Sequence, residues 1–313
     1  MLPILLKTLP FFALIGLGYG AARARFFNEQ ATAYLTRFVF YFALSAMLFG
    51  FAASLSVAEI YDGPFVMAYL VGSGAVYVLA MGVAFARRVP LGEAAIEAQC
   101  AVIGNTGFLG VPMLIVLLGP NAAGPVLMIL ALDLIVFSTL ITLIVTASRG
   151  GRVSPAIVGQ LFIGLLKNPM IVAMVLGLGW SATGWALPGP VQEFMAILGG
   201  AATPCALFAI GASLAAKSAE RVQVALWLSG CKLLLHPLAI AVAALVLFPV
   251  KPDAAGVLIA AAALPVAGNI FMLAQHYGIA PQRVSAAILV STALSIATIP
   301  AVIARVLPLM AVN

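Results

Sequence analysis

Residues 103 to 112 read Ile-Gly-Asn-Thr-Gly-Phe-Leu-Gly-Val-Pro and lie inside an apolar run of the length of a membrane-spanning helix. The stretch holds three glycines, one proline and two polar side chains in ten positions. Glycine weakens a helix by about 1 kcal/mol relative to alanine, and proline by about 3 kcal/mol. Proline also frees a carbonyl of the preceding turn. We therefore predict a helix that is interrupted near its middle, with Gly107 and Pro112 among the residues that break it.

The composition of the whole chain indicates a membrane protein. Of its 313 residues, 64% are hydrophobic and 8% are charged, whereas a soluble domain has about 25% charged residues. A helix of about 20 apolar residues spans the bilayer core. The apolar runs are continuous rather than alternating, which predicts helices and excludes a transmembrane barrel.

Ten apolar segments are predicted as transmembrane helices of an all-α polytopic protein. They cover residues 4–22, 34–53, 64–86, 94–118, 122–147, 168–186, 191–214, 222–248, 254–275 and 281–306. We expect residues 154–166 to form a short connecting segment, with Ser154 as its N-cap and Pro155 at its first helical position.

Basic residues gather in the loops on one side of these helices. Those after odd-numbered helices are Arg23, Arg25, Arg87, Arg88, Arg149, Arg152, Lys167, Lys217, Arg221 and Arg283. The other side has only Lys7, Lys251 and Arg305. Because cytoplasmic loops are enriched in Lys and Arg, we expect both termini outside, in an inner or plasma membrane. The net charge of +6 does not indicate nucleic-acid binding, since no basic cluster exceeds two residues.

The chain shows traces of an internal duplication. Residues 7–19 resemble residues 167–180, and a half of five helices must insert upside down relative to its copy. We predict inverted repeats in residues 1–153 and 154–313. The stretch around Asn105 then matches either Leu264-Pro265 or, at a slightly larger offset, Gly268-Asn269. Both registers stay open, as does chance similarity between Ala/Gly-rich helices.

A second interruption is predicted in residues 263–270, which read Ala-Leu-Pro-Val-Ala-Gly-Asn-Ile. Interrupted helices at corresponding positions of two inverted halves indicate a transporter binding site, although kinks that serve only packing are the alternative. Half-helix N-termini carry partial positive charge and suit a carboxylate. The predicted substrate-binding residues are Gly104, Asn105, Thr106, Pro265 and Asn269, with Ser45 and Thr203 facing a central cavity and Gly268 as a further helix break.

Few ionisable residues fall near the middle of the apolar helices, where charge is costly and marks function. Asp133 lies in residues 122–147, and Lys232 and His236 lie in residues 222–248. Asp133 with Lys232 would form a neutral pair, and Asp133 with His236 a protonatable one that carries a coupling proton. A static ion pair that joins the two helices is the alternative.

Enzyme chemistry finds no support in the sequence, and we expect no catalytic residue, cofactor or metal ion. The chain lacks a phosphate-binding glycine loop and His/Cys ligand spacing, and its three cysteines stand singly. No loop has room for a nucleotide-binding domain, so a gradient would have to drive any transport.

Several stretches together resemble the auxin efflux carrier family, which includes bacterial malonate and malate permeases and plant auxin exporters. They are residues 104–112, Lys167-Asn-Pro169, residues 204–213, residues 232–237, and Ala263-Leu-Pro265 leading to Tyr277-Gly278. The resemblance covers essentially the full chain. Gly104 replaces a proline of the plant carriers, and their long loop between helices 5 and 6 is absent.

The resemblance implies ten helices in two inverted five-helix repeats, with helices 4 and 9 crossing at broken points beside Asn105 and Pro265. It implies a scaffold of helices 1, 2, 6 and 7, often dimeric, and a moving domain of helices 3–5 and 8–10. An elevator motion and an organic-anion substrate follow from the same resemblance.

These lines converge on a secondary transporter of a small organic anion, embedded in a lipid bilayer as a homodimer and coupled to protons. The substrate would be a malonate- or malate-like carboxylate or an auxin-like acid. Two rivals remain: a sodium-coupled carrier of bile-acid type, and a membrane sensor that binds its ligand without moving it.

Overall fold

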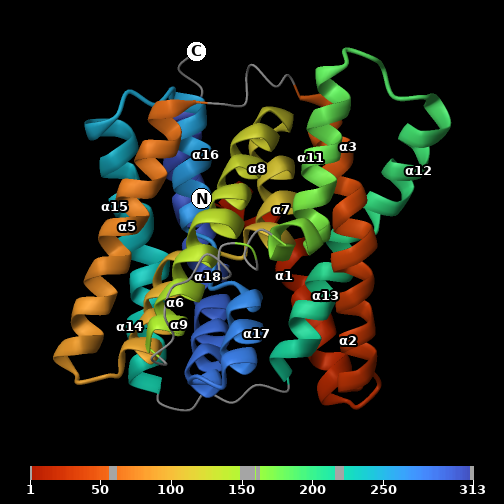
Figure 1. The fold of residues 1–313 in the computed structure, drawn as a ribbon. Coiled ribbons are helices and arrows are strands. Elements are labelled where there is room, and N and C mark those ends of the chain that lie inside the picture. The colour runs from red at the N-terminus through yellow and green to blue at the C-terminus, as the bar shows by residue number, and fades with distance from the viewer. Residues whose placement is uncertain (1, 56–61, 149–158, 160–162, 216–221, 311–313) are drawn as a thin grey trace.

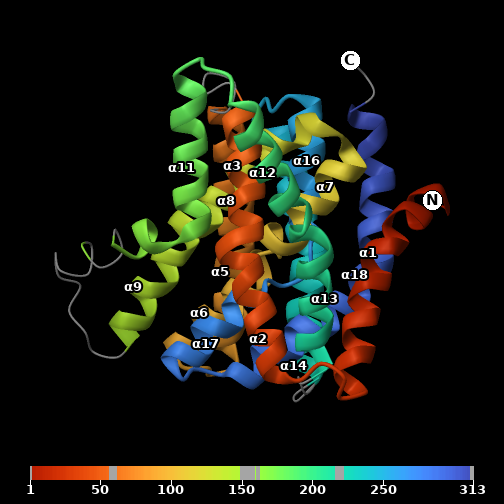
Figure 2. The same ribbon diagram turned by 90° about the vertical axis from the view of Figure 1, so that its right-hand side faces the viewer.

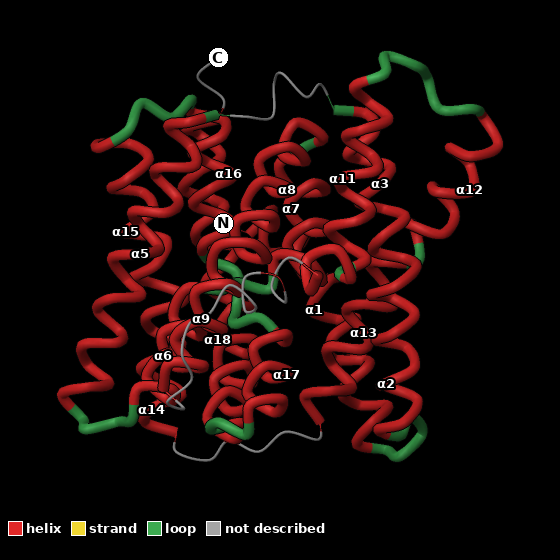
Figure 3. The backbone as a smooth tube through the Cα atoms, viewed as in Figure 1, coloured by secondary structure: helices red, strands yellow, loops and turns green. Residues whose placement is uncertain are grey.

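Helices are the only regular elements in the part of the chain that the structure describes. The computed structural model describes residues 2–55, 62–148, 159, 163–215 and 222–310. Figure 3 shows the helices joined by short loops. The all-helical class predicted from the sequence is confirmed for these residues.

Seven of the described helices are long and apolar enough to cross a membrane. They are Ile4–Arg23, Glu29–Ser54, Gly63–Ala86, Pro120–Ser148, Gly189–Ala215, Val222–Leu247 and Pro281–Met310. Three shorter apolar helices are Thr106–Leu118, Pro169–Ala182 and Pro252–Ala262. Each of the ten predicted segments overlaps one of these helices.

Several long helices consist of shorter pieces. The α-helices are α1 (Leu2–Arg23), α2 (Glu29–Phe38), α3 (Leu44–Ser54), α5 (Gly63–Ala86), α6 (Leu91–Val102), α7 (Val111–Leu118), α8 (Ala123–Leu132), α9 (Ser138–Ser148), α11 (Pro169–Ala182), α12 (Gly189–Gly200), α13 (Ala202–Ala215), α14 (Val222–Gly230), α15 (His236–Val242), α16 (Pro252–Ala262), α17 (Gly268–Tyr277) and α18 (Pro281–Met310). The π-helical turns are Val39–Ala43, Thr106–Gly110, Asp133–Phe137, Cys231–Leu235 and Ala243–Leu247.

The most extensive packing lies inside two groups of helices. In the first group α1 packs along α13, and α3 packs against α11 and α12. In the second group α5 packs on α6 and α15, and α18 packs on α14 and α16. Figure 1 shows α3, α11, α12 and α13 on the right and α5, α14, α15 and α16 on the left. Figure 2 turns the first group toward the viewer.

Glycines permit the close helix contacts inside the first group. A Cβ atom on Gly18 of α1 would collide with the Phe208 carbonyl of α13, and one on Gly211 of α13 would collide with the Ile15 carbonyl of α1. Small residues let membrane helices approach this closely.

Some expectations concern residues outside the described ranges. Ser154 and Pro155 lie there, as do Arg149, Arg152, Lys217 and Arg221. The predicted cap and the full charge asymmetry therefore stay predictions. The predicted helix 168–186 is shorter in the structure, since α11 ends at Ala182 and Gly184 then has φ +70°. Its start is capped by Asn168, whose side chain accepts from the Met170 N–H at 3.0 Å.

Candidate functional site

Both predicted interruptions are present in the structure. α6 ends at Val102 and the helix resumes at Thr106, while α16 ends at Ala262 and α17 begins at Gly268. Gly107, Pro112 and Gly268 thus lie beside the breaks, in the helices that follow them. Pro112 follows the π-helical turn Thr106–Gly110 inside the helix Thr106–Leu118, where its missing N–H frees a carbonyl of the preceding turn.

The two interruptions cross and pair with each other. The Asn105 N–H donates to the Pro265 carbonyl at 2.8 Å, and the Ala267 N–H donates to the Ile103 carbonyl at 3.1 Å. Gly104 and Val266 form an antiparallel bridge between these bonds. Backbone groups that lose their helical partners in a membrane must be satisfied inside the protein, and each break here satisfies the other.

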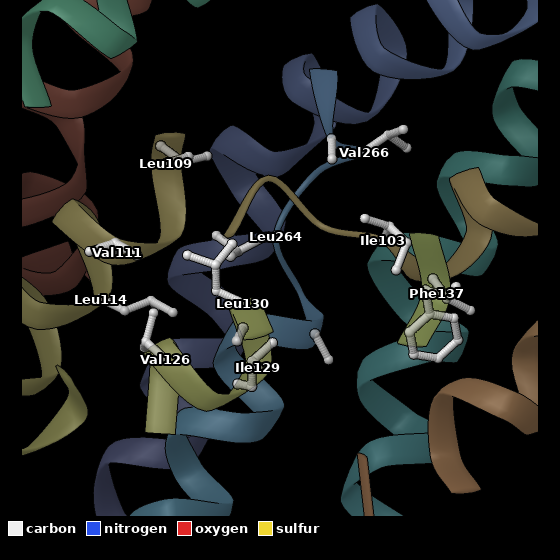
Figure 4. Close-up of a cluster of buried hydrophobic side chains, with 14 of the residues drawn as sticks. Ile103, Leu109, Val111, Leu114, Val126, Ile129, Leu130, Phe137, Leu264 and Val266 are labelled. Atoms are coloured by element: carbon white, nitrogen blue, oxygen red, sulfur yellow. The ribbon is translucent and has the colours of Figure 1, made fainter. Parts of the chain in front are cut away.

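Figure 4 shows the two extended segments passing one another within a wall of apolar side chains. The wall includes Leu109, Val111, Leu114, Val126, Ile129, Leu130 and Phe137, all of them buried. Such a wall excludes water and strengthens every polar contact at the crossing.

Asp133 accepts two hydrogen bonds in this interior. It opens the π-helical turn Asp133–Phe137 and is 5% exposed. The Tyr69 hydroxyl donates to one carboxylate oxygen, and the Thr106 hydroxyl lies 3.3 Å from the other. An ionised carboxylate only accepts hydrogen bonds, so both contacts suit the charged form.

Lys232 and His236 form a second polar chain. Lys232 is fully buried. Its ammonium donates to the Ala262 carbonyl and to His236 Nδ1, the latter at 3.1 Å. His236 Nε2 lies 2.9 Å from the Ser73 hydroxyl. With Lys232 charged, its ammonium only donates; Nδ1 then accepts, and Nε2 donates to Ser73.

A second proton on His236 would be costly. It would place two cations 3.1 Å apart, which repel by about 5 kcal/mol at an effective dielectric constant of about 20. The arrangement therefore holds His236 neutral as long as Lys232 is charged.

The predicted direct pairs of Asp133 are not found. Asp133 and Lys232 interact electrostatically, but the described ion pairs are Arg87–Glu97, Arg283–Glu93 and Arg283–Glu97. Asp133 bonds to hydroxyls instead, and the long Lys232 side chain reaches a backbone carbonyl. A salt bridge between Asp133 and Lys232 or His236 is thus absent from the described residues, while the electrostatic interaction of Asp133 with Lys232 agrees with a neutral pair; the protonatable pair of Asp133 and His236 stays a prediction.

The buried charges complement the ends of the half-helices. Lys232 lies at the C-terminal end of α16, where carbonyls carry partial negative charge, and Asp133 lies at the N-terminal end of the helix Thr106–Leu118. Neither half-helix has a side-chain cap at its N-terminus, since the N-caps Asn105 and Ala267 both lack one; the two ends differ in the carboxylate of Asp133, which accepts from the Thr106 hydroxyl. Gly268 and Asn269 in the first turn of α17 are exposed.

Asn105 carries a carboxamide without a hydrogen bond to any described residue. It is 8% exposed, and its backbone is fixed by the bond to Pro265. A buried amide normally finds partners, so this side chain has hydrogen-bonding capacity to offer a ligand at the crossing.

The crossing faces the first helix group. A Cβ atom on Gly107 would lie 2.8 Å from Met170 Cε of α11. The Phe108 ring stacks on Phe40, with centroids 6.5 Å apart. A ligand beside Asn105 would therefore sit near the boundary between the two groups.

Ser45 and Thr203 are not joined to the crossing residues. The Ser45 hydroxyl donates to the Phe40 carbonyl of its own helix at 3.1 Å. Thr203 lines a different cavity of about 630 Å³ between α3, α12 and α13, together with Met47, Trp185 and Gln192.

Tyr69 and Ser73 were not identified as site residues from the sequence, although Tyr69 bonds to Asp133 and Ser73 to His236. They lie one turn apart on α5, with Tyr77 a further turn along. Polar residues at i, i+4 and i+8 of an apolar helix are the signal that points to them. Ser291 of α18 was also missed: its hydroxyl accepts from the Val266 N–H at 3.1 Å.

Glu97 of α6 belongs to a separate ionic cluster. It is 1% exposed and pairs with Arg87 and, at 2.7 Å, with Arg283. This cluster ties α6 to the start of α18. Within the described ranges, no group of three or more His, Cys, Asp or Glu side chains is placed to hold a metal ion.

Comparisons with known proteins agree with this architecture. The sequence model of a family described as "Membrane transport protein" matches residues 3–303. The chain is also similar to a protein of Rhizobium meliloti (strain 1021) described as "Putative malonate transporter". The two are 31% identical over 298 residues, which cover 93% of this chain and 92% of that relative.

Both matches extend over nearly the whole sequence. The structure adds seven helices, among the described residues, that are long and apolar enough to cross a membrane. The chain therefore belongs to the membrane transport protein family, that of the auxin efflux carriers, and is a multi-pass membrane transporter rather than an enzyme.

Proposed function

We propose that the chain is a secondary transporter of a small mono- or dicarboxylate, with malonate and malate as its leading substrates. The observation that carries the proposal is the crossing: the α17 N-terminus has no capping side chain, and the nearby Asn105 carboxamide has no hydrogen bond to any described residue. A half-helix N-terminus at an interrupted helix suits an anionic substrate group. The description of the Rhizobium relative supports the same substrate class.

The carboxylate would bind between Asn105 and the first turn of α17 at Asn269. Thr106 stands one residue further along but already faces Asp133 at 3.3 Å, which makes it an indirect contributor. Gly104 and Pro265 supply the backbone of the crossing. Ser45 and Thr203 remain predictions as substrate contacts, and nothing in their surroundings adds support.

The proposed mechanism is alternating access by an elevator motion in an inverted repeat of ten transmembrane helices. The two groups of helices support it, because the first contains α1–α3 and α11–α13 and the second contains α5 and α6 with α14–α16 and α18. The first group would be the scaffold and the homodimer contact, and the second would move with the crossing. We place the protein in the cell membrane with both termini outside.

Proton coupling is part of the proposal, and Asp133 is its candidate carrier. His236 stays a second and less favoured candidate, because a proton added to it would place two cations, His236 and the Lys232 ammonium, 3.1 Å apart. Protonation of Asp133 would change its hydrogen bonds to Tyr69 and Thr106. Thr106 is the first residue of the helix that follows the crossing, so the change would reach the proposed binding site.

The decisive experiment is uptake of radiolabelled malonate and malate into liposomes that contain the purified protein, with and without an imposed pH gradient. Gradient-dependent accumulation is expected. Uptake that requires Na⁺ would favour a sodium-coupled carrier instead. Binding without counterflow would favour a sensor.

The Asn105 site is tested with N105A, which should lower malonate affinity about tenfold or more, since a hydrogen bond to a charged group contributes about 1.5–3 kcal/mol. N121A is the matched control, because Asn121 is exposed in the turn Pro120–Ala122. Equal malonate affinity in N105A and N121A would count against the site.

A further inference from the structure

The C-terminal end of α16 exposes a backbone carbonyl to the crossing. The Ala263 N–H bonds to Ile259 and Ala260, and the Leu264 N–H bonds to Ala261. Ala262 is thus the last carbonyl of α16; the Lys232 ammonium donates to it, and the His236 ring also lies within hydrogen-bonding reach of it. Carbonyls and C-terminal ends of interrupted helices are where carriers coordinate a coupling cation.

The same ammonium lies against the other interruption. A Cβ atom on Gly104 would come within 3.3 Å of both Lys232 Cε and Lys232 Nζ. The glycine therefore leaves room for the lysine at the point where the two breaks pair. One positive charge touches both interrupted helices at once.

The surroundings of Lys232 are those of a cation site. Its contacts are the Ala262 carbonyl and the neutral nitrogen of His236. Asp133 supplies a negative charge in the same interior, held by the hydroxyls of Tyr69 and Thr106. Lys232 itself is fully buried, so no water shell competes with these groups.

We propose that the Lys232 ammonium is a tethered counter-cation that occupies, at the crossing, the place a free monovalent cation takes in cation-coupled carriers. The inference rests on the proposed carboxylate transport and deepens it. Since the cation is covalently attached, substrate binding needs no dissolved metal cation. Removal of the side chain would leave the Ala262 carbonyl and His236 Nδ1 facing a space that a small free cation can enter.

The test compares the parent protein with K232A in sodium, ammonium and choline chloride at equal ionic strength. The matched control is K251A, because Lys251 is the exposed N-cap at the opposite end of the same helix, α16. Two quantities are measured in each salt: the thermal unfolding midpoint in detergent, and the affinity for radiolabelled malonate.

The parent and K251A should give the same midpoint and affinity in all three salts. K232A in choline should unfold at a clearly lower temperature and lose at least an order of magnitude in malonate affinity. Ammonium or sodium, but not choline, should raise its midpoint in a concentration-dependent way, as expected for a ligand that binds the folded state. Malonate affinity should recover in the same salts.

Two results would overturn the inference. One is a parent protein whose malonate binding or uptake requires sodium. The other is K232A that folds and binds malonate alike in all salts. If K232A cannot be purified folded, K232M keeps the side-chain volume; it should lose malonate affinity without recovery in ammonium, and unchanged affinity would refute the role.

The stability measurement separates this inference from the proposed function. Salt-specific recovery of the K232A midpoint, with no malonate binding by any protein, would leave the cation site standing and remove the carboxylate substrate. Sodium-dependent malonate uptake by the parent protein would support the proposed substrate and refute the proposal that Lys232 is a tethered counter-cation.

Discussion

The two interrupted helices satisfy their free backbone groups in the same way, but they differ in the charge that lies beside their N-terminal ends. The free backbone N–H and carbonyl groups of each break form hydrogen bonds with those of the other. Neither helix has a side-chain cap at its N-terminus, but the helix that resumes at Thr106 has the buried carboxylate of Asp133 beside its first residue, whereas Gly268 and Asn269 in the first turn of α17 are exposed. The first end has a protein carboxylate next to it, and the second end is where we propose that the substrate binds. Two interruptions with the same backbone pairing therefore differ through a few buried side chains.

The largest effect should come from removing the charge that lies beside the first helix end. D133N keeps the shape of the side chain but leaves Lys232 as an uncompensated buried cation, and breaking a buried charge pair costs about 3–5 kcal/mol. The thermal midpoint in detergent should fall far more than for E193Q, an amide substitution at an exposed site on α12. The double variant D133N/K232M should unfold at a higher temperature than the two separate losses predict. A D133N midpoint equal to that of E193Q would mean that Asp133 does not balance Lys232.

The next effect tests the hydroxyl that holds Asp133. Y69F removes the donor to the carboxylate, and a hydrogen bond to a charged group is worth about 1.5–3 kcal/mol. We expect a lower thermal midpoint for Y69F than for Y19F, since Tyr19 lies exposed on α1. Indistinguishable midpoints would show that Tyr69 is not a significant support of Asp133.

Alanine substitutions at Gly104, inside the first break, and at Gly268, directly after the second, should have different effects on stability. A Cβ atom on Gly104 would lie 3.2 Å from Leu264 Cβ, whereas one on Gly268 meets nothing within 4 Å. Overpacking of this kind costs about 1–3 kcal/mol, so G104A should lower the midpoint and G268A should not. The reverse order would contradict the described packing of the crossing.

The smallest effect on folding, and a sharp one on binding, is expected at the open helix end. N269D places a carboxylate in the first turn of α17, where a negative charge stabilises a helix by about 0.3–1 kcal/mol. The same charge should repel the substrate and lower malonate affinity about tenfold, which corresponds to about 1.4 kcal/mol. N121D, at an exposed turn, serves as the control. Malonate binding by N269D at the parental affinity would place the substrate elsewhere.

The sequence was sufficient to predict features that depend on local composition. The interruptions follow from glycine and proline inside apolar runs, and the membrane helices follow from run length and low charge. The ends of helices were less accurate, as at α11, because a glycine turn inside an apolar run stops a helix without changing its hydropathy.

The contacts of the site could not be predicted, because they join residues far apart in the chain. Ser73 and His236 are separated by 163 residues, and their contact depends on how α5 packs on α15. Helical spacing shows that Tyr69 and Ser73 share a face of α5 but not which helix that face meets. Nor does the sequence show that Asp133 and Lys232, each in a π-helical turn, bond to hydroxyls and to a backbone carbonyl rather than to each other.

The pairing of the two breaks also constrains biogenesis. Asn105 and Pro265 lie 160 positions apart in the printed sequence, and ribosomes add roughly 5–20 residues per second, so the first break waits roughly 10–30 s for its partner. During that interval its unpaired backbone cannot rest in lipid. The nascent first half must therefore stay beside water, or inside a protein-lined insertion site, until the last helices emerge. Truncation after the first half would leave a segment that the membrane cannot accept, and quality control would act on it there.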